Sequence, residues 1–221
     1  METSFYVIYL AFIMTMGILM IVKSKQNKAF LFFGIACVVL GFGDAFHLVP
    51  RAIRLFTKTL DNPSPDLAKD LGYGKLLTSI TMTVFYGLLY CFIYSLTGKK
   101  RNKYIDLTVA GLIFLRVLLC AFPENGWEDN SYNFSWAFLR NLPFLALGIL
   151  VIILSLEKLK NRKYLRYLWI LIALSFAFYL PVVFFASANS WVGLFMIPKT
   201  IVYMMIALFG YLELKRSKKE D

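Results

Sequence analysis

Seven stretches of mainly apolar residues, each about 20 residues long, recur along the sequence and constrain the fold more than any other feature. They cover residues 4–22, 29–50, 76–97, 105–122, 135–155, 168–186 and 191–212. An α-helix rises about 1.5 Å per residue, so about 20 residues span the hydrocarbon core of a bilayer. The stretches do not alternate with a period of two, which argues against barrel strands. We predict an all-α membrane protein that forms a seven-transmembrane helix bundle.

The composition favours a single membrane domain over residues 1–221. Of these residues, 59% are hydrophobic and 17% are aromatic, which exceeds what the polar surface of a soluble domain can cover. Only short polar segments separate the apolar stretches, so no separate soluble domain is expected. No basic cluster precedes the first apolar stretch, which is unlike a cleaved secretory signal. We therefore expect a multi-pass protein of the cell membrane.

The positive charge of the chain is concentrated in alternate connections. The formal net charge is +11, and most Lys and Arg residues lie in four segments, 23–28, 99–103, 158–166 and 215–219. Short basic loops stay in the cytoplasm during membrane insertion. This asymmetry predicts an N-terminus outside the cell and a C-terminus in the cytoplasm. It also favours membrane lipids as partners over nucleic acid, because no basic segment carries interleaved aromatic residues.

Three further predictions concern the connections and the segments that flank the apolar stretches. Trp127 and Tyr132 lie in an outer connection and suit an interfacial aromatic belt. The last outer connection, 187–190, is very short, which predicts antiparallel neighbours for the last two helices. The second helix is expected to continue beyond the membrane surface through 51–60, until a Pro-rich loop ends it.

The third and seventh apolar stretches share a residue pattern. Three positions coincide when the two stretches are aligned: Thr83 with Thr200, Tyr86 with Tyr203, and Tyr94 with Tyr211. The pattern predicts a 3+1+3 parallel repeat, in which two three-helix units are joined by the fourth helix. Parallel repeats of this kind place a binding site at the interface between the halves.

Four ionisable residues lie inside the predicted spans, where charged groups are costly and usually mark function. They are Asp44, Arg116, Arg140 and Lys199, and each comes from a different helix. Counted from the ends of their helices at about 1.5 Å per residue, all four fall in the outer third of the membrane. We predict that Asp44 lies within salt-bridge or one-water reach of at least one of the three cations.

Neighbouring polar residues extend this charged layer. Asp44, His47 and Arg51 are spaced three and four residues apart, which places them on one helical face. Gly41 and Gly43 allow close helix approach beside the acid. The complete set of predicted ligand-binding residues is Asp44, His47, Arg51, Arg116, Arg140, Asn141, Lys199 and Tyr203.

Two interpretations of the charged layer stay open. In the structural one, the cations extend to the outer headgroups and Asp44 pairs with one of them. In the functional one, three cations exceed a single carboxylate, so a carboxylate, phosphate or lipid headgroup from outside completes the site. The functional interpretation predicts a transporter or receptor for a small anionic or zwitterionic ligand. We assign no catalytic residue, cofactor or metal, because one histidine and scattered cysteines form no metal-binding pattern.

A short motif supplies an alternative. Gly43 and Asp44, in the segment 40–44, resemble the Gly-Asp of an early helix in lysoplasmalogenase-like membrane proteins. The Ser-Asp of a late helix in that family would correspond to Ser175, which no acid follows. The resemblance implies an intramembrane lipid hydrolase or transferase, with Asp44 and His47 in acid–base roles. The missing second acid puts half of that machinery in doubt.

Overall fold

The computed structural model describes every residue except 1, 25–26, 57–64, 99, 186–189 and 221. The described residues form the helices α1 (Glu2–Ser24), α2 (Lys28–Phe56), α3 (Pro65–Thr97), α4 (Lys103–Cys120), α5 (Phe134–Lys158), α6 (Leu168–Phe185) and α7 (Met196–Glu220). Three short 3-10 segments are η1 (Pro123–Asn125), η2 (Leu165–Tyr167) and η3 (Ser190–Phe195). The all-α prediction is confirmed for this part of the chain.

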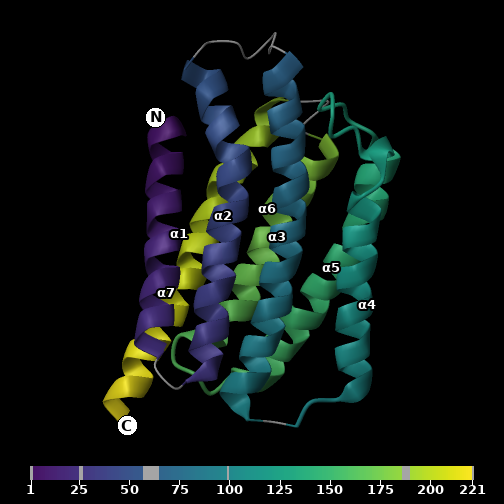
Figure 1. Ribbon diagram of the computed structural model, residues 1–221. Coiled ribbons are helices and arrows are strands. Elements are labelled where there is room, and N and C mark those ends of the chain that lie inside the picture. The colour runs from purple at the N-terminus through teal and green to yellow at the C-terminus, as the bar shows by residue number, and fades with distance from the viewer. Residues whose placement is uncertain (1, 25–26, 57–64, 99, 186–189, 221) are drawn as a thin grey trace.

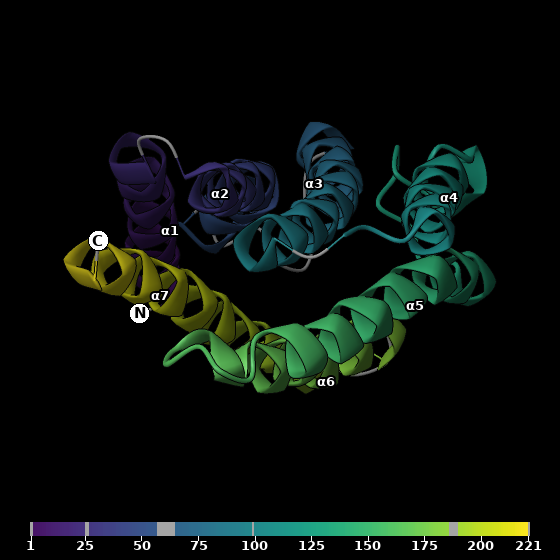
Figure 2. The same cartoon turned by 90° about the horizontal axis from the view of Figure 1, so that it is seen from below.

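Six of these helices are long and apolar enough to cross a membrane. The exception is α4, whose 18 residues include Lys103, Asp106 and Arg116. It nevertheless runs alongside α3 and α5 (Figures 1 and 2). Six of the described helices therefore have the length and apolarity of membrane spans, and the seventh span stays a prediction.

The helices are arranged in two layers (Figure 2). One layer holds α1, α2 and α3, with α4 at its edge, and the other holds α5, α6 and α7. The layers join where α1 packs against α7 and where α3 packs against α5. This places the two predicted three-helix units on opposite sides of the bundle with α4 between them at one edge. The duplication itself stays a prediction.

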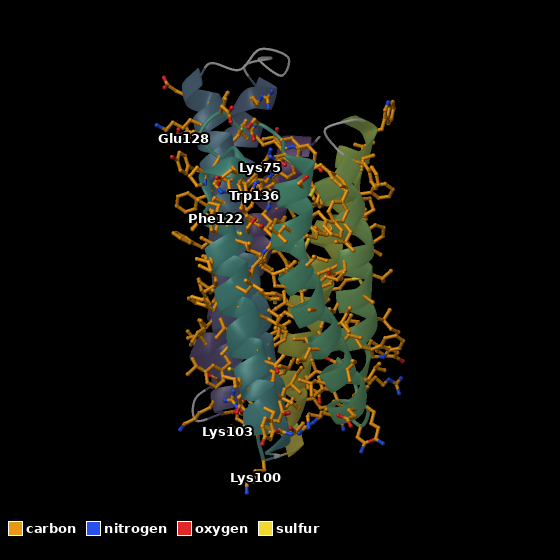
Figure 3. All side chains as sticks on the ribbon, turned by 90° about the vertical axis from the view of Figure 1, so that its right-hand side faces the viewer. Lys75, Lys100, Lys103, Phe122, Glu128 and Trp136 are labelled. Atoms are coloured by element: carbon orange, nitrogen blue, oxygen red, sulfur yellow. The ribbon has the colours of Figure 1, made fainter. Side chains whose placement is uncertain are left out.

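The two ends of the bundle differ in charge. The N-terminus, η1 and η3 lie at one end, which we call the upper end, and the C-terminus lies at the opposite, lower end (Figure 1). Figure 3 shows Lys75 and Glu128 toward the upper end and Lys100 and Lys103 at the lower end. The alternate basic connections thus share one end of the molecule, as a seven-helix topology requires.

Two helix boundaries differ from the predicted ones. Helix α3 begins at Pro65, eleven residues before the predicted start at 76. Proline is favoured in the first turn of a helix and Asp66 complements the helix dipole there, so this polar segment is helical without being apolar. The predicted start of the last span at 191 falls in η3, and α7 begins at Met196 with Pro198 in its first turn.

Other predicted features of the helices are confirmed or lie outside the described residues. Helix α2 extends past 50 to Phe56, while the rest of its predicted extension, 57–60, is outside the described residues. Helices α6 and α7 are antiparallel neighbours, as the short connection between them predicted (Figure 1).

Glycines set the close packing of α2 against its neighbours. A Cβ atom added at Gly43 would lie 1.7 Å from Thr81 Oγ1 of α3, and one added at Gly41 would lie 2.7 Å from Ile13 Cγ2 of α1. The hydroxyl of Thr78 also donates a hydrogen bond of 3.0 Å to the Gly43 carbonyl oxygen. The predicted close approach is confirmed, and it places the next residue, Asp44, inside the bundle.

Candidate ligand-binding site

The buried carboxylate of Asp44 is held by a tyrosine of α1. The Asp44 side chain is 4% exposed, and Tyr9 Oη donates a hydrogen bond of 2.6 Å to its Oδ2 atom. Lys199, which is 2% exposed, acts electrostatically on Asp44. Within the described part of the chain, no salt bridge joins Asp44 to a cation. Asp44 and Lys199 thus interact electrostatically, but the direct hydrogen-bond partner of the acid is Tyr9, which is not among the predicted site residues.

Aromatic rings surround the Lys199 ammonium group. Its Nζ atom lies 5.5 Å from the ring centroid of Tyr179 in α6 and 5.6 Å from that of Tyr203, one turn along α7. The faces of aromatic rings attract cations, and the attraction is larger where water is excluded. The rings therefore stabilise a lysine that has left water without meeting a carboxylate directly.

Arg116 is a buried cation with incomplete hydrogen bonding. It is 1% exposed, and its Nη1 atom donates to the Arg140 carbonyl oxygen and, at 3.0 Å, to Asn141 Oδ1. Its guanidinium carbon lies 4.9 Å from the Phe144 ring centroid. The Nε and Nη2 atoms are buried and have no hydrogen-bond partner in the structure. Arg116 thus belongs to the interface of α4 and α5.

Arg140 is positioned by the connection between α4 and α5. Its Nη1 atom donates a hydrogen bond of 2.6 Å to Asn125 Oδ1, and its guanidinium group lies 4.5 Å from the Trp127 ring. Trp127 is only 7% exposed, and its Nε1 atom donates to the Cys120 carbonyl oxygen at 2.8 Å. The prediction of an interfacial role is therefore wrong for Trp127, because its ring packs inward and supports Arg140.

Asn141 links the two arginine environments to α6. Its Oδ1 atom accepts hydrogen bonds from Arg116 Nη1 and, at 3.0 Å, from the Tyr179 hydroxyl. Its Nδ2 atom donates to the Ala137 carbonyl oxygen at 2.6 Å. The network therefore runs from α4 through α5 to α6 and ends at the ring that contacts Lys199.

A cavity of about 370 Å³ opens among α2, α3, α5, α6 and α7 toward the upper end. Its basic lining residues are His47, Arg51, Lys75, Arg140 and Lys199. Its uncharged polar lining residues are Thr78, Ser79, Asn130, Tyr132 and Tyr179. Its remaining lining residues are Met82, Val182, Val183, Gly193 and Met196. Among the described residues that line it, none is a carboxylate.

The cavity contains only half of the predicted ligand-binding set. His47, Arg51, Arg140 and Lys199 line it. The other four predicted residues, Asp44, Arg116, Asn141 and Tyr203, are buried in the surrounding bundle and are not part of the lining. An anion in this cavity would therefore meet Arg140, whereas Arg116 supports the wall through Asn141. Of the two predicted ligand-binding arginines, only Arg140 lines the cavity.

Two lining residues, Lys75 and Tyr179, are absent from the predicted ligand-binding set. Lys75 precedes the predicted start of the third span and therefore falls in a predicted connection. In the structure it belongs to α3 and lies on the same helical face as Ser79. Its Nζ atom donates a hydrogen bond of 2.6 Å to Asn130 Oδ1. Tyr179 lies in a helix that is apolar on all sides, so no sequence signal distinguished it.

Two polar groups of the lining differ in their hydrogen bonding. The Nδ1 atom of His47 is buried and has no hydrogen-bond partner in the structure. The Tyr132 hydroxyl donates to the Phe184 carbonyl oxygen at 3.1 Å. Burial raises the pKa of Tyr132 above its ordinary value, so this hydroxyl is neutral at physiological pH.

The two residues that resemble the lysoplasmalogenase-like motifs, Ser175 and Asp44, have different hydrogen-bond partners. The Ser175 hydroxyl donates to the Ile172 carbonyl oxygen at 2.7 Å and lies 2.9 Å from the Tyr86 hydroxyl. Asp44 instead pairs with Tyr9. No protein family model, curated protein or solved structure matches the chain. The resemblance to that family therefore stays a prediction.

Proposed function

We propose that this chain is a multi-pass membrane protein, of transporter or receptor type, that binds a small anionic ligand in the cavity from the outer side. One observation carries the proposal. Four cationic side chains and a histidine line the cavity, and the described lining residues include no carboxylate. A cavity of about 370 Å³ is within the usual range for small-molecule sites.

The charges of the lining act on one another. Lys75 is within electrostatic range of Arg51, Arg54 and Arg140. Like charges held close together repel, and this cost falls when an anion enters between them. Guanidinium and ammonium groups also make strong charge-assisted hydrogen bonds to carboxylates and phosphates. Binding of an anion therefore satisfies both the charge and the hydrogen-bonding capacity of the site.

The proposed topology implies a direction of entry. We propose that α4 completes seven spans and that the upper end faces the outside, because the basic connections at the lower end favour the cytoplasm. The packing of α4 against α5 supports this proposal, since it buries the costly Arg116 charge between helices. The cavity then opens to the outer water and headgroup layer.

The test is anion-dependent thermal stabilisation of the purified full-length chain in detergent. Phosphate, sulfate, acetate and succinate are compared at constant ionic strength. A ligand that binds only the folded state raises its stability in proportion to RT ln(1 + [L]/Kd). We expect at least one anion to raise the melting temperature, and we expect Arg51→Gln and Lys199→Gln to require at least about tenfold more of it, since a charge-assisted contact is worth about 1.5–3 kcal/mol.

Lys69→Gln is the matched control. Lys69 is an exposed residue of α3 and does not line the cavity. Its replacement should leave the required anion concentration within a few fold. The proposal is wrong if no anion stabilises the wild-type chain, or if Lys69→Gln weakens the response as much as Arg51→Gln. Either result would instead support the structural interpretation, in which the buried charges only stabilise the fold.

A further inference from the structure

The lining of the cavity has two chemically different parts. Basic and polar side chains come from α2, α3, α5, the connection before α5, Tyr179 of α6 and Lys199 of α7. The wall formed by α6, η3 and the start of α7 presents Val182, Val183, Gly193 and Met196. A ligand that fills this cavity therefore meets cations on one side and an apolar surface on the other.

The basic part favours a phosphate group over a carboxylate. A carboxylate brings one negative charge and two acceptor oxygens, so it can contact only part of the cationic lining. A phosphate monoester carries a charge of about −1.5 to −2 at pH 7 and three strong acceptor oxygens. The donors available include two guanidinium groups, Arg51 and Arg140, and the ammonium groups of Lys75 and Lys199. Their number and their origin in four different helices match an anion that accepts from several directions.

The same lining disfavours a zwitterion. The described lining offers no carboxylate to a cationic group of the ligand, since Asp44 is not part of it, and four cations would repel such a group. Asp44 already accepts a hydrogen bond from Tyr9.

The apolar wall favours a ligand that also has an apolar part. Burying apolar surface contributes about 0.8 kcal/mol per methylene group, so an occupant with a hydrocarbon portion binds this wall better than a hydrated ion does. Large exposed apolar side chains continue beyond the wall at the upper ends of α6 and η3, among them Phe185, Leu194 and Phe195. The cavity volume of about 370 Å³ is the volume that roughly a dozen water molecules occupy in liquid water. It therefore accommodates a phosphate and one short chain.

From this lining we infer that the ligand is a phosphate ester carrying a single apolar chain, with its phosphate among the four cations and its chain against α6 and α7. The inference rests on the proposed anion-binding function and specifies its ligand class. A soluble alkyl phosphate and a single-chain phospholipid share this chemistry, and the length of the chain that still increases affinity distinguishes them.

The test uses inorganic phosphate and a series of ethyl, butyl and hexyl phosphates with the full-length chain in detergent. We expect the concentration needed for a given rise in melting temperature to fall about three- to fourfold per methylene group. Val183→Thr keeps the shape of the side chain but makes it polar, so it should flatten the dependence on chain length. The response to inorganic phosphate should change by no more than about twofold. Val49→Thr, at an exposed position of α2 outside the cavity, is the control.

Head-group controls separate recognition from detergent-like effects. Hexyltrimethylammonium has the same chain and the opposite charge and should not stabilise the protein, and hexanoate should be at least about tenfold weaker than hexyl phosphate. A long-chain alkyl phosphate in mixed micelles should bind still more tightly if the natural source is a lipid, whereas a plateau at hexyl indicates a soluble ester.

Defined results overturn the inference. Stabilisation by inorganic phosphate with no gain along the chain series contradicts it, as does a response to hexanoate or hexyltrimethylammonium equal to that of hexyl phosphate. Equal flattening by Val49→Thr also contradicts it. If Val183→Thr does not fold, the series on the wild-type chain decides alone. Absence of stabilisation by every anion, inorganic phosphate included, refutes the proposed function itself.

Discussion

Replacing Tyr9 by phenylalanine isolates the contact that holds the buried acid of the bundle. The change removes only the hydroxyl that donates the 2.6 Å hydrogen bond to Asp44 Oδ2. The ring of Tyr9, which is fully buried, keeps its volume and its packing, so no cavity forms. The Asp44 carboxylate remains in the interior without its described hydrogen-bond donor.

The size of the effect follows from the charge and burial of the acceptor. Hydrogen bonds to charged groups contribute about 1.5–3 kcal/mol, while side-chain hydrogen bonds between membrane helices average about 0.6 and reach about 1.7 kcal/mol. Because both partners are buried and the acceptor is a carboxylate, we expect a loss of about 1.5 kcal/mol. At about 2–4 °C per kcal/mol for a chain of this size, the melting temperature should fall by about 3–6 °C.

A double-mutant cycle with Asp44→Asn makes the measurement specific to this pair. Thermal unfolding is recorded for the wild type, both single variants and the double variant in one detergent. If the contact carries the effect, Tyr9→Phe should cost at least about 0.5 kcal/mol less in the Asp44→Asn background, because the charged acceptor is gone. Tyr94→Phe is the control, since Tyr94 is also buried but its hydroxyl makes no hydrogen bond to a described residue.

Additivity of the two changes would refute the reasoning, because it would show that Tyr9 and Asp44 do not interact energetically. A loss for Tyr94→Phe as large as that for Tyr9→Phe would also refute it. Such a loss would indicate a general cost of removing hydroxyl groups from this bundle.

The remaining predictions concern topology and helix packing. In a cysteine-free background of intact cells, an impermeant thiol reagent should label a cysteine placed at Asn130 but not one placed at Lys100 or Lys160, because basic connections stay cytoplasmic; labelling at 100 or 160 would overturn the orientation. Gly43→Ala should destabilise the protein by about 1–3 kcal/mol, since the added Cβ would overlap Thr81 of α3. Gly111→Ala, where an added Cβ meets no atom within 4 Å, should be neutral or stabilise α4 by up to about 1 kcal/mol; equal losses in the two unfolding measurements would contradict this account of the α2–α3 contact.

The sequence alone determined that the chain is helical and which apolar stretches carry charged residues. In hydrocarbon every backbone polar group needs an internal partner, so long apolar stretches form helices whatever their neighbours are. Charges inside such stretches stand out because they are costly there, and for this reason Asp44, Arg116, Arg140 and Lys199 were recognisable. The start of α3 was not recognisable from apolarity, because its first turns are polar and exposed.

Only the tertiary structure decided which of these charges face the cavity and which are enclosed. Helices such as α6 are apolar on all sides, so their sequences do not show which face meets a neighbour. Contacts between helices depend on where small residues permit close approach, and Gly43 decides this for α2 and α3. The pairing of Asp44 with Tyr9 and the enclosure of Arg116 behind Asn141 follow from that packing, since their partners lie on other helices and have no regular spacing in the sequence.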